Sequence, residues 1–247
     1  MPVSDTMSLR GGLEQAVAAA DVDRARKEYW SQNECLILKK FLPRSVVEST
    51  LVPVVERLRA DLNRNYVPGR KKGGSVSYFT IQKKAPEFLE LYHSVAFRDF
   101  LSRLVNVPLV LCPDTDPHSC ALYYYTEPGD YIGFHYDTSY YKGARYTILL
   151  GVIDQAPSCR LAYQLFKDDP TRQMQEVHLS TGPGDMVIFN GDKLWHAVTP
   201  LGDGEYRVVL TLEYLTSQEM GTFKRLYSNL KDAVGYFGLK AVFQRKG

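Results

Sequence analysis

The second half of the chain contains a series of short runs rich in Val, Ile, Leu, Tyr and Thr. Turn sequences such as PGD, YKGA, TGPGD and LGDGE separate these runs. Such runs are typical of β-strands, and many short strands at regular spacing favour a sandwich or jelly roll, whose two sheets protect each other's edges. The strands are expected at residues 121–126, 133–138, 145–153, 161–166, 176–179, 185–189, 195–199 and 206–214. The chain should therefore be mostly β.

The flanking regions have a different character, because apolar residues recur there at helical spacing. Helices are expected at residues 13–30, 46–62, 86–104 and 217–230. A short strand is expected at residues 36–38, between the first two helices. Residues 63–77 combine Pro and Gly with a basic run, and this composition predicts a loop. The expected fold is a jelly roll supported by helices.

The length of 247 residues fits one domain, since all-β folds of this size are commonly single units. We expect mainly helical support at residues 1–105, a jelly-roll core at 106–215, and a C-terminal helix and tail at 216–247. Hydrophobic residues make up 45% of the chain, which is enough for a packed core and argues against disorder. The oligomeric state is left open.

Charge and cysteine content limit the partners and the compartment. A formal charge of +2 gives no electrostatic footprint for nucleic acid or an acidic membrane surface. The four cysteines form no C-x-x-C pair, which favours a reducing compartment over a disulfide framework. The N-terminal residues lack the pattern of a secretory signal, and no run reaches the ~18 apolar residues of a membrane span. We therefore expect a cytoplasmic protein with no nucleic acid or membrane partner.

A candidate metal site begins with His135 and Asp137, which lie two positions apart in an expected strand. Residues i and i+2 of a strand project from the same face, so an imidazole and a carboxylate can converge on one ion. His196 lies in a later expected strand that could return a second imidazole to that face. Two imidazoles and one carboxylate form the facial triad of non-haem Fe(II) oxygenases, and they also suit catalytic zinc.

Arg207 favours iron over zinc. It lies eleven residues after His196, at the start of an apolar strand where an unpaired guanidinium is costly to bury. A dicarboxylate that chelates iron by its keto-acid end would offer its other carboxylate to this arginine. Thr211 lies four residues further along the same face and could add a hydrogen bond.

The motifs and their order resemble the Fe(II)/2-oxoglutarate dioxygenases, and within them the prolyl-hydroxylase-like group. The matching segments are Tyr125 followed by EPGD and the H-x-D pair, then GARYTILLGVID, GPGDMVIF, WHAV and YRVVLT. The leading CLILKKFLPRSVVE also looks like that family's opening strand and helix. The resemblance covers roughly residues 121–214.

The resemblance implies a double-stranded β-helix, a variant of the jelly roll. It implies that His135, Asp137 and His196 are the catalytic iron ligands, and that Arg207 binds the distal carboxylate of 2-oxoglutarate. Tyr125 and Thr211 match positions that face this co-substrate. The implied activity is hydroxylation of a C–H bond, with O2 consumed and 2-oxoglutarate converted to succinate and CO2. Ascorbate would be an optional reductant.

Two departures from the family pattern bear on the substrate. Ser158-Cys159-Arg160 stands where many relatives have Gly-Gly, and Gly151 or Val152 stands where prolyl hydroxylases have a tyrosine. We therefore expect a rebuilt substrate pocket. Because the sequence shows no basic or acidic docking surface, we expect a small metabolite or amino-acid-like substrate. The basic run at residues 70–72 is either a solvated loop or a lid whose cations meet an anionic substrate.

Three other functions stay open. A peptidyl or prolyl hydroxylase would use the same iron site on a protein substrate. A zinc-dependent hydrolase would use the same three ligands without oxygen. A non-catalytic jelly-roll binding module would keep the polar cluster as a vestige.

Overall fold

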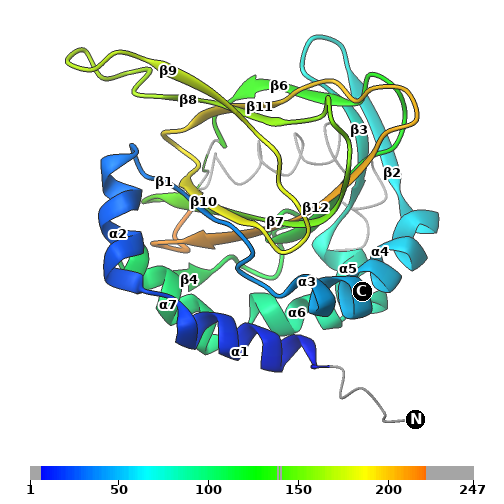
Figure 1. Ribbon diagram of the computed structural model, residues 1–247, viewed down its shortest axis with the longest axis horizontal. Coiled ribbons are helices and arrows are strands. Elements are labelled where there is room, and N and C mark those ends of the chain that lie inside the picture. Colours follow the sequence, from blue (N-terminus) through cyan, green and yellow to red (C-terminus); the bar gives the residue numbers. More distant parts are fainter. Residues whose placement is uncertain (1–6, 138, 140, 221–247) are drawn as a thin grey trace.

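One curled antiparallel sheet forms the centre of the molecule (Figure 1). The computed structural model describes residues 7–137, 139 and 141–220. Its twelve strands follow the order β1-β10-β7-β12-β5-β3-β6-β11-β8-β9, with β2 beside β3 and β4 beside β12. The strands are β1 (Cys35–Leu38), β2 (Asn63–Val67), β3 (Lys71–Val76), β4 (Val110–Leu111), β5 (Cys120–Tyr125), β6 (Tyr131–His135), β7 (Arg145–Gln155), β8 (Leu161–Leu165), β9 (Gln175–Leu179), β10 (Met186–Asn190), β11 (Trp195–Val198) and β12 (Tyr206–Leu215).

The predicted mostly-β fold and all eight strands expected in the second half are confirmed, with most bounds shifted by no more than two residues. The largest difference is in β6, which ends at His135, so Asp137 lies beyond the strand. Curling of the sheet brings β6 and β11 across the interior from β7 and β12 (Figure 1). The curled sheet therefore encloses a space into which one face of each strand points.

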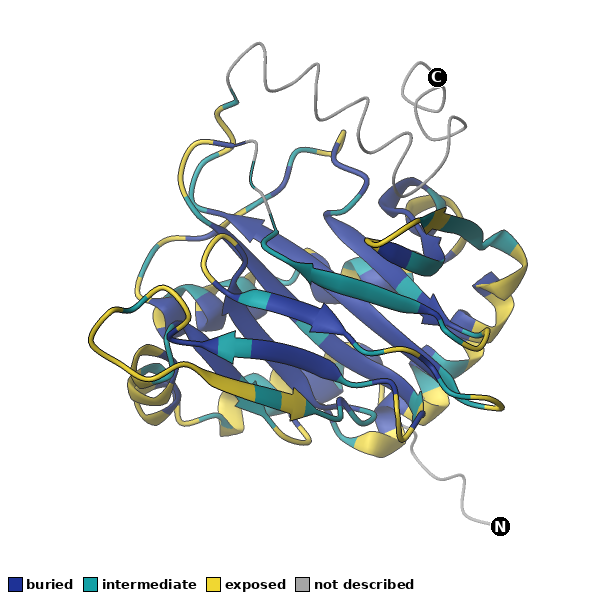
Figure 2. Ribbon diagram, turned by 90° about the horizontal axis from the view of Figure 1, so that it is seen from above, coloured by how far each residue is buried: buried dark blue, intermediate teal, exposed yellow. Residues whose placement is uncertain are grey.

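Helices cover the outer face of β10, β7 and β12 (Figure 1). The helical elements are α1 (Leu9–Ala19), α2 (Val22–Ser31), α3 (Arg44–Val46), η1 (Val47–Leu51), α4 (Val52–Leu58), η2 (Arg59–Asp61), α5 (Tyr78–Lys84), α6 (Glu87–Tyr92) and α7 (Val95–Val105). The strands between helices and interior are almost wholly buried, whereas the edge strand β9 is largely exposed (Figure 2).

The side chains of strand β12 alternate between the hydrophobic core beneath the helices and the cavity inside the curled sheet. Its even-numbered residues 208–214 pack into the core shared with the helices. Its odd-numbered residues 207–213 line an open cavity of about 630 Å³. Because successive side chains of a strand point to opposite faces, one strand can serve both purposes. The apolar residues hold the sheet on the helices while the polar ones face the interior.

The loop predicted at residues 63–77 is wrong, because these residues form the β2–β3 hairpin. Gly69, with φ +72°, occupies the turn, where a positive φ favours glycine. Strand β3 is bonded to β2, β5 and β6, so its backbone finds partners far away in the sequence. The glycine content of this segment suggested a loop, but Gly73 and Gly74 pair with residues of the neighbouring strands.

The predicted helix boundaries also needed correction. Residues 13–30 contain two helices, because Asp21 caps α2 by accepting a hydrogen bond from the backbone N–H of Arg24 at 3.0 Å. Residues 86–104 likewise contain α6 and α7, with Ser94 capping the second. Helix α5 was not expected.

The helix expected at residues 46–62 is present as a series of turns rather than one regular helix. It contains the π turn η1, which ends two residues before Pro53, a residue with no N–H to donate to the preceding turn. The closing helix expected at residues 217–230 falls mostly outside the described residues, and residues 217–220 are not helical.

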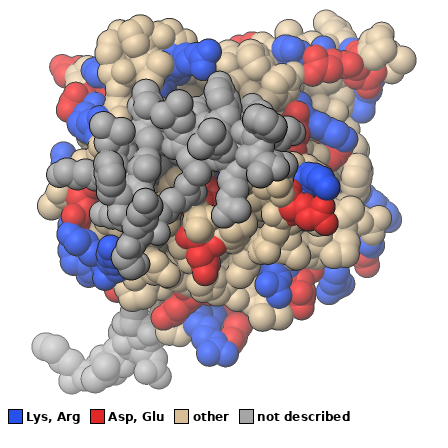
Figure 3. Space-filling model, turned by 180° about the vertical axis from the view of Figure 1, so that it is seen from behind, with Lys and Arg blue, Asp and Glu red and all other residues tan. Residues whose placement is uncertain are grey.

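The division of the chain at residue 105 stays a prediction, although β1, β2 and β3 precede it and belong to the same sheet as the later strands. No helix among residues 7–137 and 141–220 has the length and apolar character needed to cross a bilayer. The face seen in Figure 3 mixes acidic and basic side chains where the described residues are visible.

Candidate metal centre

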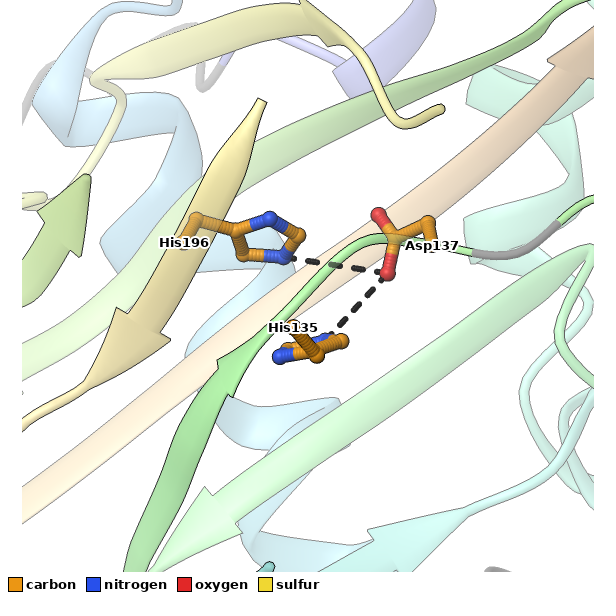
Figure 4. A group of neighbouring side chains, drawn as sticks. All are labelled: His135, Asp137 and His196. Carbon is orange, nitrogen blue, oxygen red and sulfur yellow. Dashed lines mark ion pairs between the residues drawn. The ribbon is translucent and has the colours of Figure 1, made fainter. Parts of the chain in front are cut away.

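His135, Asp137 and His196 converge on one point inside the curled sheet (Figure 4). His135 ends β6, His196 lies in β11, and the two residues are direct partners in the β6–β11 pair. Asp137 Oδ1 lies 3.4 Å from Nε2 of His135 and 3.7 Å from Nε2 of His196. One potential ligand atom of each residue lies within 4.8 Å of the others. Two nitrogens and one oxygen in this arrangement suit a divalent transition metal.

Both imidazoles are oriented by backbone carbonyls. Nδ1 of His135 lies 2.9 Å from the carbonyl oxygen of Gly133, and Nδ1 of His196 lies 2.9 Å from that of Leu194. A carbonyl can only accept, so each Nδ1 carries the hydrogen and donates it. Each Nε2 lone pair is then free to bind a metal, and the ring orientation is fixed by the second nitrogen.

Asp137 is held in place from two sides. Its backbone N–H donates to the carbonyl of Gly191 at 2.9 Å, and the hydroxyl of Thr147 donates to its Oδ2 at 2.7 Å. A Cβ on Gly191 would lie 2.8 Å from Cβ of Asp137 and 3.1 Å from Oγ1 of Thr147. Glycine is therefore required there, because any side chain would displace the carboxylate.

Burial and mutual contact shift the pKa values of these three groups. Burial opposes ionisation of Asp137, but the two imidazoles outweigh it and hold the pKa of this carboxyl below its usual value. Burial lowers the pKa of His196. Burial also disfavours the charged form of His135, yet its contact with Asp137 prevails and raises the pKa of this imidazole. The cluster thus already contains the negative charge that a cation requires.

Arg207, Tyr125 and Thr211 line the same cavity as the three potential ligands. Arg207 is 1% exposed, donates to Oγ1 of Thr181 at 2.9 Å and lies 5.1 Å over the ring of Tyr125. Its Nε has no hydrogen-bond partner in the part of the chain that the structure describes. A buried guanidinium with a free donor fits an incoming carboxylate.

The two departures from the family pattern lie beside Arg207. Cys159 is fully buried and packs against Tyr125. A Cβ on Gly151 would lie 2.3 Å from the carbonyl oxygen of Thr181, so no larger residue fits there. Because Thr181 also accepts from Arg207, these changes alter the arginine end of the cavity. The two departures therefore lie at the arginine end of the cavity, and the rebuilt substrate pocket expected from the sequence stays a prediction.

A buried polar network at the opposite end of the cavity was not anticipated. Glu213 Oε2 lies 3.1 Å from Nε of Arg145 and 3.0 Å from Oγ1 of Thr147. Arg145 also contacts Asp116 at 3.4 Å. Burial raises the pKa of Glu213 to about 8, against the opposing effect of Arg145. The alternation along β12 was the available signal, since Glu213 is two residues beyond Thr211.

The basic run at residues 70–72 spans the end of the β2–β3 turn, where Arg70 lies, and the first two residues of the paired strand β3. The backbone N–H of Gly133 donates to the carbonyl of Arg70 at 2.7 Å, which ties the hairpin to β6. Lys71 is buried and lines the cavity, whereas Lys72 donates to the carbonyl of Pro128. Burial lowers the pKa of Lys71 to about 7. The hairpin is thus a fixed wall of the cavity in this structure.

Comparison with known proteins gives relatives by structure only. No protein family model matches the chain, and no curated protein matches its sequence. The epimerase SnoN, in complex with Fe3+, alpha ketoglutarate and nogalamycin RO, is similar with a TM-score of 0.63 and 15% identity over 78% of this chain and 83% of SnoN.

Two prolyl hydroxylases are similar as well. One, from Trichoplax adhaerens in complex with a hypoxia inducible factor peptide fragment, gives a TM-score of 0.64 and 15% identity over 87% of this chain and 95% of the relative. A prolyl-4-hydroxylase from Pseudomonas putida gives a TM-score of 0.59 and 14% identity over 81% of this chain and 100% of the relative. At these identities the likeness establishes the fold, and the jelly-roll resemblance predicted from the sequence is confirmed at that level.

Proposed function

We propose that this chain is a 2-oxoglutarate-dependent dioxygenase in which His135, Asp137 and His196 hold Fe(II). Arg207 would bind the distal carboxylate of 2-oxoglutarate. The observation that carries this proposal is the guanidinium of Arg207, which is 1% exposed, has a free Nε and lines the cavity of the three ligands. A buried cation without an acid is costly, and a metal-chelating dicarboxylate would supply the missing negative charge.

Bound Fe(II) and 2-oxoglutarate would supply the oxidation of a C–H bond by O2, coupled to decarboxylation of 2-oxoglutarate to succinate and CO2. Residues of the chain position the reactants. Arg207 offers a planar set of donors that matches a carboxylate. Burial raises the pKa of Tyr125, so this phenol stays neutral and can donate a hydrogen bond. Thr211 provides a hydroxyl on the same inner face of β12.

The same residues limit the access of water. Tyr125, Thr211 and Arg207 are each at most 5% exposed, so the co-substrate end of the cavity is enclosed. Exclusion of water strengthens the charge-assisted hydrogen bonds in such a site and protects reactive species from side reactions. Asp137 would supply the one carboxylate ligand of the proposed Fe(II) site.

We further propose that the substrate is a small metabolite or an amino-acid-like molecule, which is most simply hydroxylated. A cavity of about 630 Å³ is in the range of small-molecule sites. The hydrogen bond from Gly133 to Arg70 holds the β2–β3 hairpin against β6, where it forms one wall of this cavity. Similarity to SnoN and to a peptide-bound hydroxylase is equally high, so substrate size must be tested directly.

The decisive test is anaerobic addition of Fe(II) and 2-oxoglutarate to the metal-free protein. We expect a visible metal-to-ligand charge-transfer band, which requires both groups at one centre. Arg207→Met is the matched control, and it should shift the 2-oxoglutarate titration to much higher concentration while Fe(II) still binds. Absence of the band in metal-loaded protein, or hydrolysis supported by zinc without oxygen, would overturn the proposal in favour of a zinc hydrolase.

A further inference from the structure

We propose that Glu213 is a positioning residue for the metal centre, acting through Thr147 to hold Asp137 as a one-oxygen ligand. This inference rests on the proposed function in one respect, namely that His135, Asp137 and His196 bind a divalent metal. Thr147 contacts the proposed ligand Asp137, and Glu213 contacts Thr147, so neither would bind the metal itself.

The first step is the strand register. Thr147 of β7 and Glu213 of β12 are direct partners in the β7–β12 pair. Both line the cavity, so their side chains share the inner face of the sheet. Cross-strand partners bring their Cβ atoms to ~5 Å, within reach of a hydrogen bond between the two side chains. Oγ1 of Thr147 and Oε2 of Glu213 are in fact 3.0 Å apart.

The two carboxylate oxygens of Asp137 have different surroundings. Oδ1 faces Nε2 of both imidazoles, at 3.4 and 3.7 Å, and is the oxygen placed to share a metal with them (Figure 4). Oδ2 accepts a hydrogen bond from Thr147 at 2.7 Å. An oxygen held in this way is turned from the metal, so the carboxylate can ligate through Oδ1 alone.

The hydroxyl of Thr147 lies between two carboxyl groups, those of Asp137 and Glu213. The hydroxyl of Thr147 has one hydrogen, yet its oxygen lies within hydrogen-bond distance of both Asp137 Oδ2 and Glu213 Oε2. Both contacts are satisfied if Thr147 donates to Asp137 and Glu213 supplies the second hydrogen as a neutral acid. Glu213 then fixes the direction in which the threonine hydroxyl points.

Arg145 and Asp116 hold Glu213 in turn. Arg145 Nε donates to Glu213 Oε2 at 3.1 Å, and its Nη2 lies 3.4 Å from Asp116 Oδ2. Tyr141 donates to the same oxygen of Asp116 at 3.1 Å. These residues are each 5–7% exposed, so the network has little freedom to rearrange. A rigid support of this kind is what orients a metal ligand from behind.

The test uses Co(II) alone as the probe, because its binding and visible spectrum need neither 2-oxoglutarate nor turnover. Thr147→Val keeps the side-chain shape and removes the hydroxyl, and Thr147→Ser is the matched control that retains it. We expect Thr147→Val to weaken Co(II) binding by about 10- to 100-fold, as for other supports of metal ligands. Its d–d spectrum should also change as Oδ2 becomes free to coordinate, while Thr147→Ser stays close to the parent in both.

A double-mutant cycle tests whether Glu213 acts through Thr147. Glu213→Leu, which has no donor, should weaken Co(II) binding several-fold in the parent and have no further effect in Thr147→Val. Glu213→Gln is the matched control, because its amide can still donate to Thr147, and it should stay closer to the parent. Equal effects of Glu213→Leu in both backgrounds would overturn the proposal, as would a Thr147→Val protein with the parent's affinity and spectrum. If Thr147→Val does not fold, an unchanged Co(II) affinity in folded Glu213→Leu would overturn it equally. The charge-transfer test of the proposed function is separate, since it requires 2-oxoglutarate.

Discussion

Strand β12 carries a buried ionisable side chain near each end of its inner face, and the two are in opposite situations. Glu213 contacts Arg145, which contacts Asp116, so the ionisable groups at that end are linked to one another. Arg207, at the other end, contacts the neutral Thr181 and keeps a free Nε among the described residues. A completed network can orient neighbouring groups, whereas a buried cation without an acid is suited to a ligand.

The largest effect should come from the metal ligands that lie between the two ends. His196→Ala removes one of two imidazoles, and we expect loss of metal binding and turnover in a protein that still folds. His178→Ala is the matched control, because this histidine is exposed on the edge strand β9 and contacts Glu176. Metal titration and circular dichroism of both variants are the measurements. Parent-like turnover in His196→Ala would refute the ligand assignment.

Paired arginine substitutions test the contrast directly. Arg145→Met leaves Glu213 and Asp116 without their cation, so the free energy of unfolding should fall by about 3 to 5 kcal/mol. Arg207→Met removes a cation that has no acid, and its unfolding free energy should change little. Its 2-oxoglutarate requirement should instead rise about thirtyfold or more, from a loss of ~2 to 5 kcal/mol. The free energies of unfolding are measured by urea denaturation. An equal loss of stability in both variants would contradict the difference drawn between the two arginines.

Lys71 is also buried on the wall of the cavity, and burial lowers its pKa to about 7. In the unfolded chain this amine has its usual pKa of 10.5, so between the two values the unfolded state binds more protons. The free energy of unfolding should therefore rise as the pH rises from about 7 to 10. Lys71→Met cannot titrate and should flatten this rise. An unchanged pH profile would contradict the burial argument.

The smallest effect is expected at Gly191, which gives Asp137 its space. Gly191→Ala places a Cβ 2.8 Å from Cβ of Asp137, so the carboxylate must move and metal affinity should fall by about tenfold. Gly73→Ala is the control, because its Cβ would make only an ordinary contact of 3.6 Å with Tyr124. Calorimetric titration with metal compares the two. An affinity equal to the parent in Gly191→Ala would show that Asp137 has more room than the geometry indicates.

Several features of the molecule could be predicted from the sequence because each is encoded by neighbours in the chain. Alternating apolar residues between turn signals located the strands of the second half, and all eight were confirmed. The spacing of His135 and Asp137 predicted that they converge, and the structure brings both to one point with His196. The expected strand ends at His135, however, so Asp137 lies just beyond it. The roles of these residues, and of Arg207, Tyr125 and Thr211, remain predictions until the metal and co-substrate are tested.

Features that depend on distant partners could not be predicted in this way. The β2–β3 hairpin has the composition of a loop and becomes a strand pair only because β5 and β6 offer hydrogen-bond partners. Glu213 looked like an ordinary charged residue, and its link to Asp137 exists only because β7 and β12 pair in one register.

The sequence by itself determined which segments are strands and which residue types could bind a metal, because periodicity and ligand spacing are local properties. Only the tertiary structure decided which charges are paired. Arg145 meets Glu213 across 68 positions of sequence, whereas Nε of Arg207 has no hydrogen-bond partner among the described residues. That difference arises from sheet curling and burial, which give each charge its neighbours and set the cost of leaving it alone.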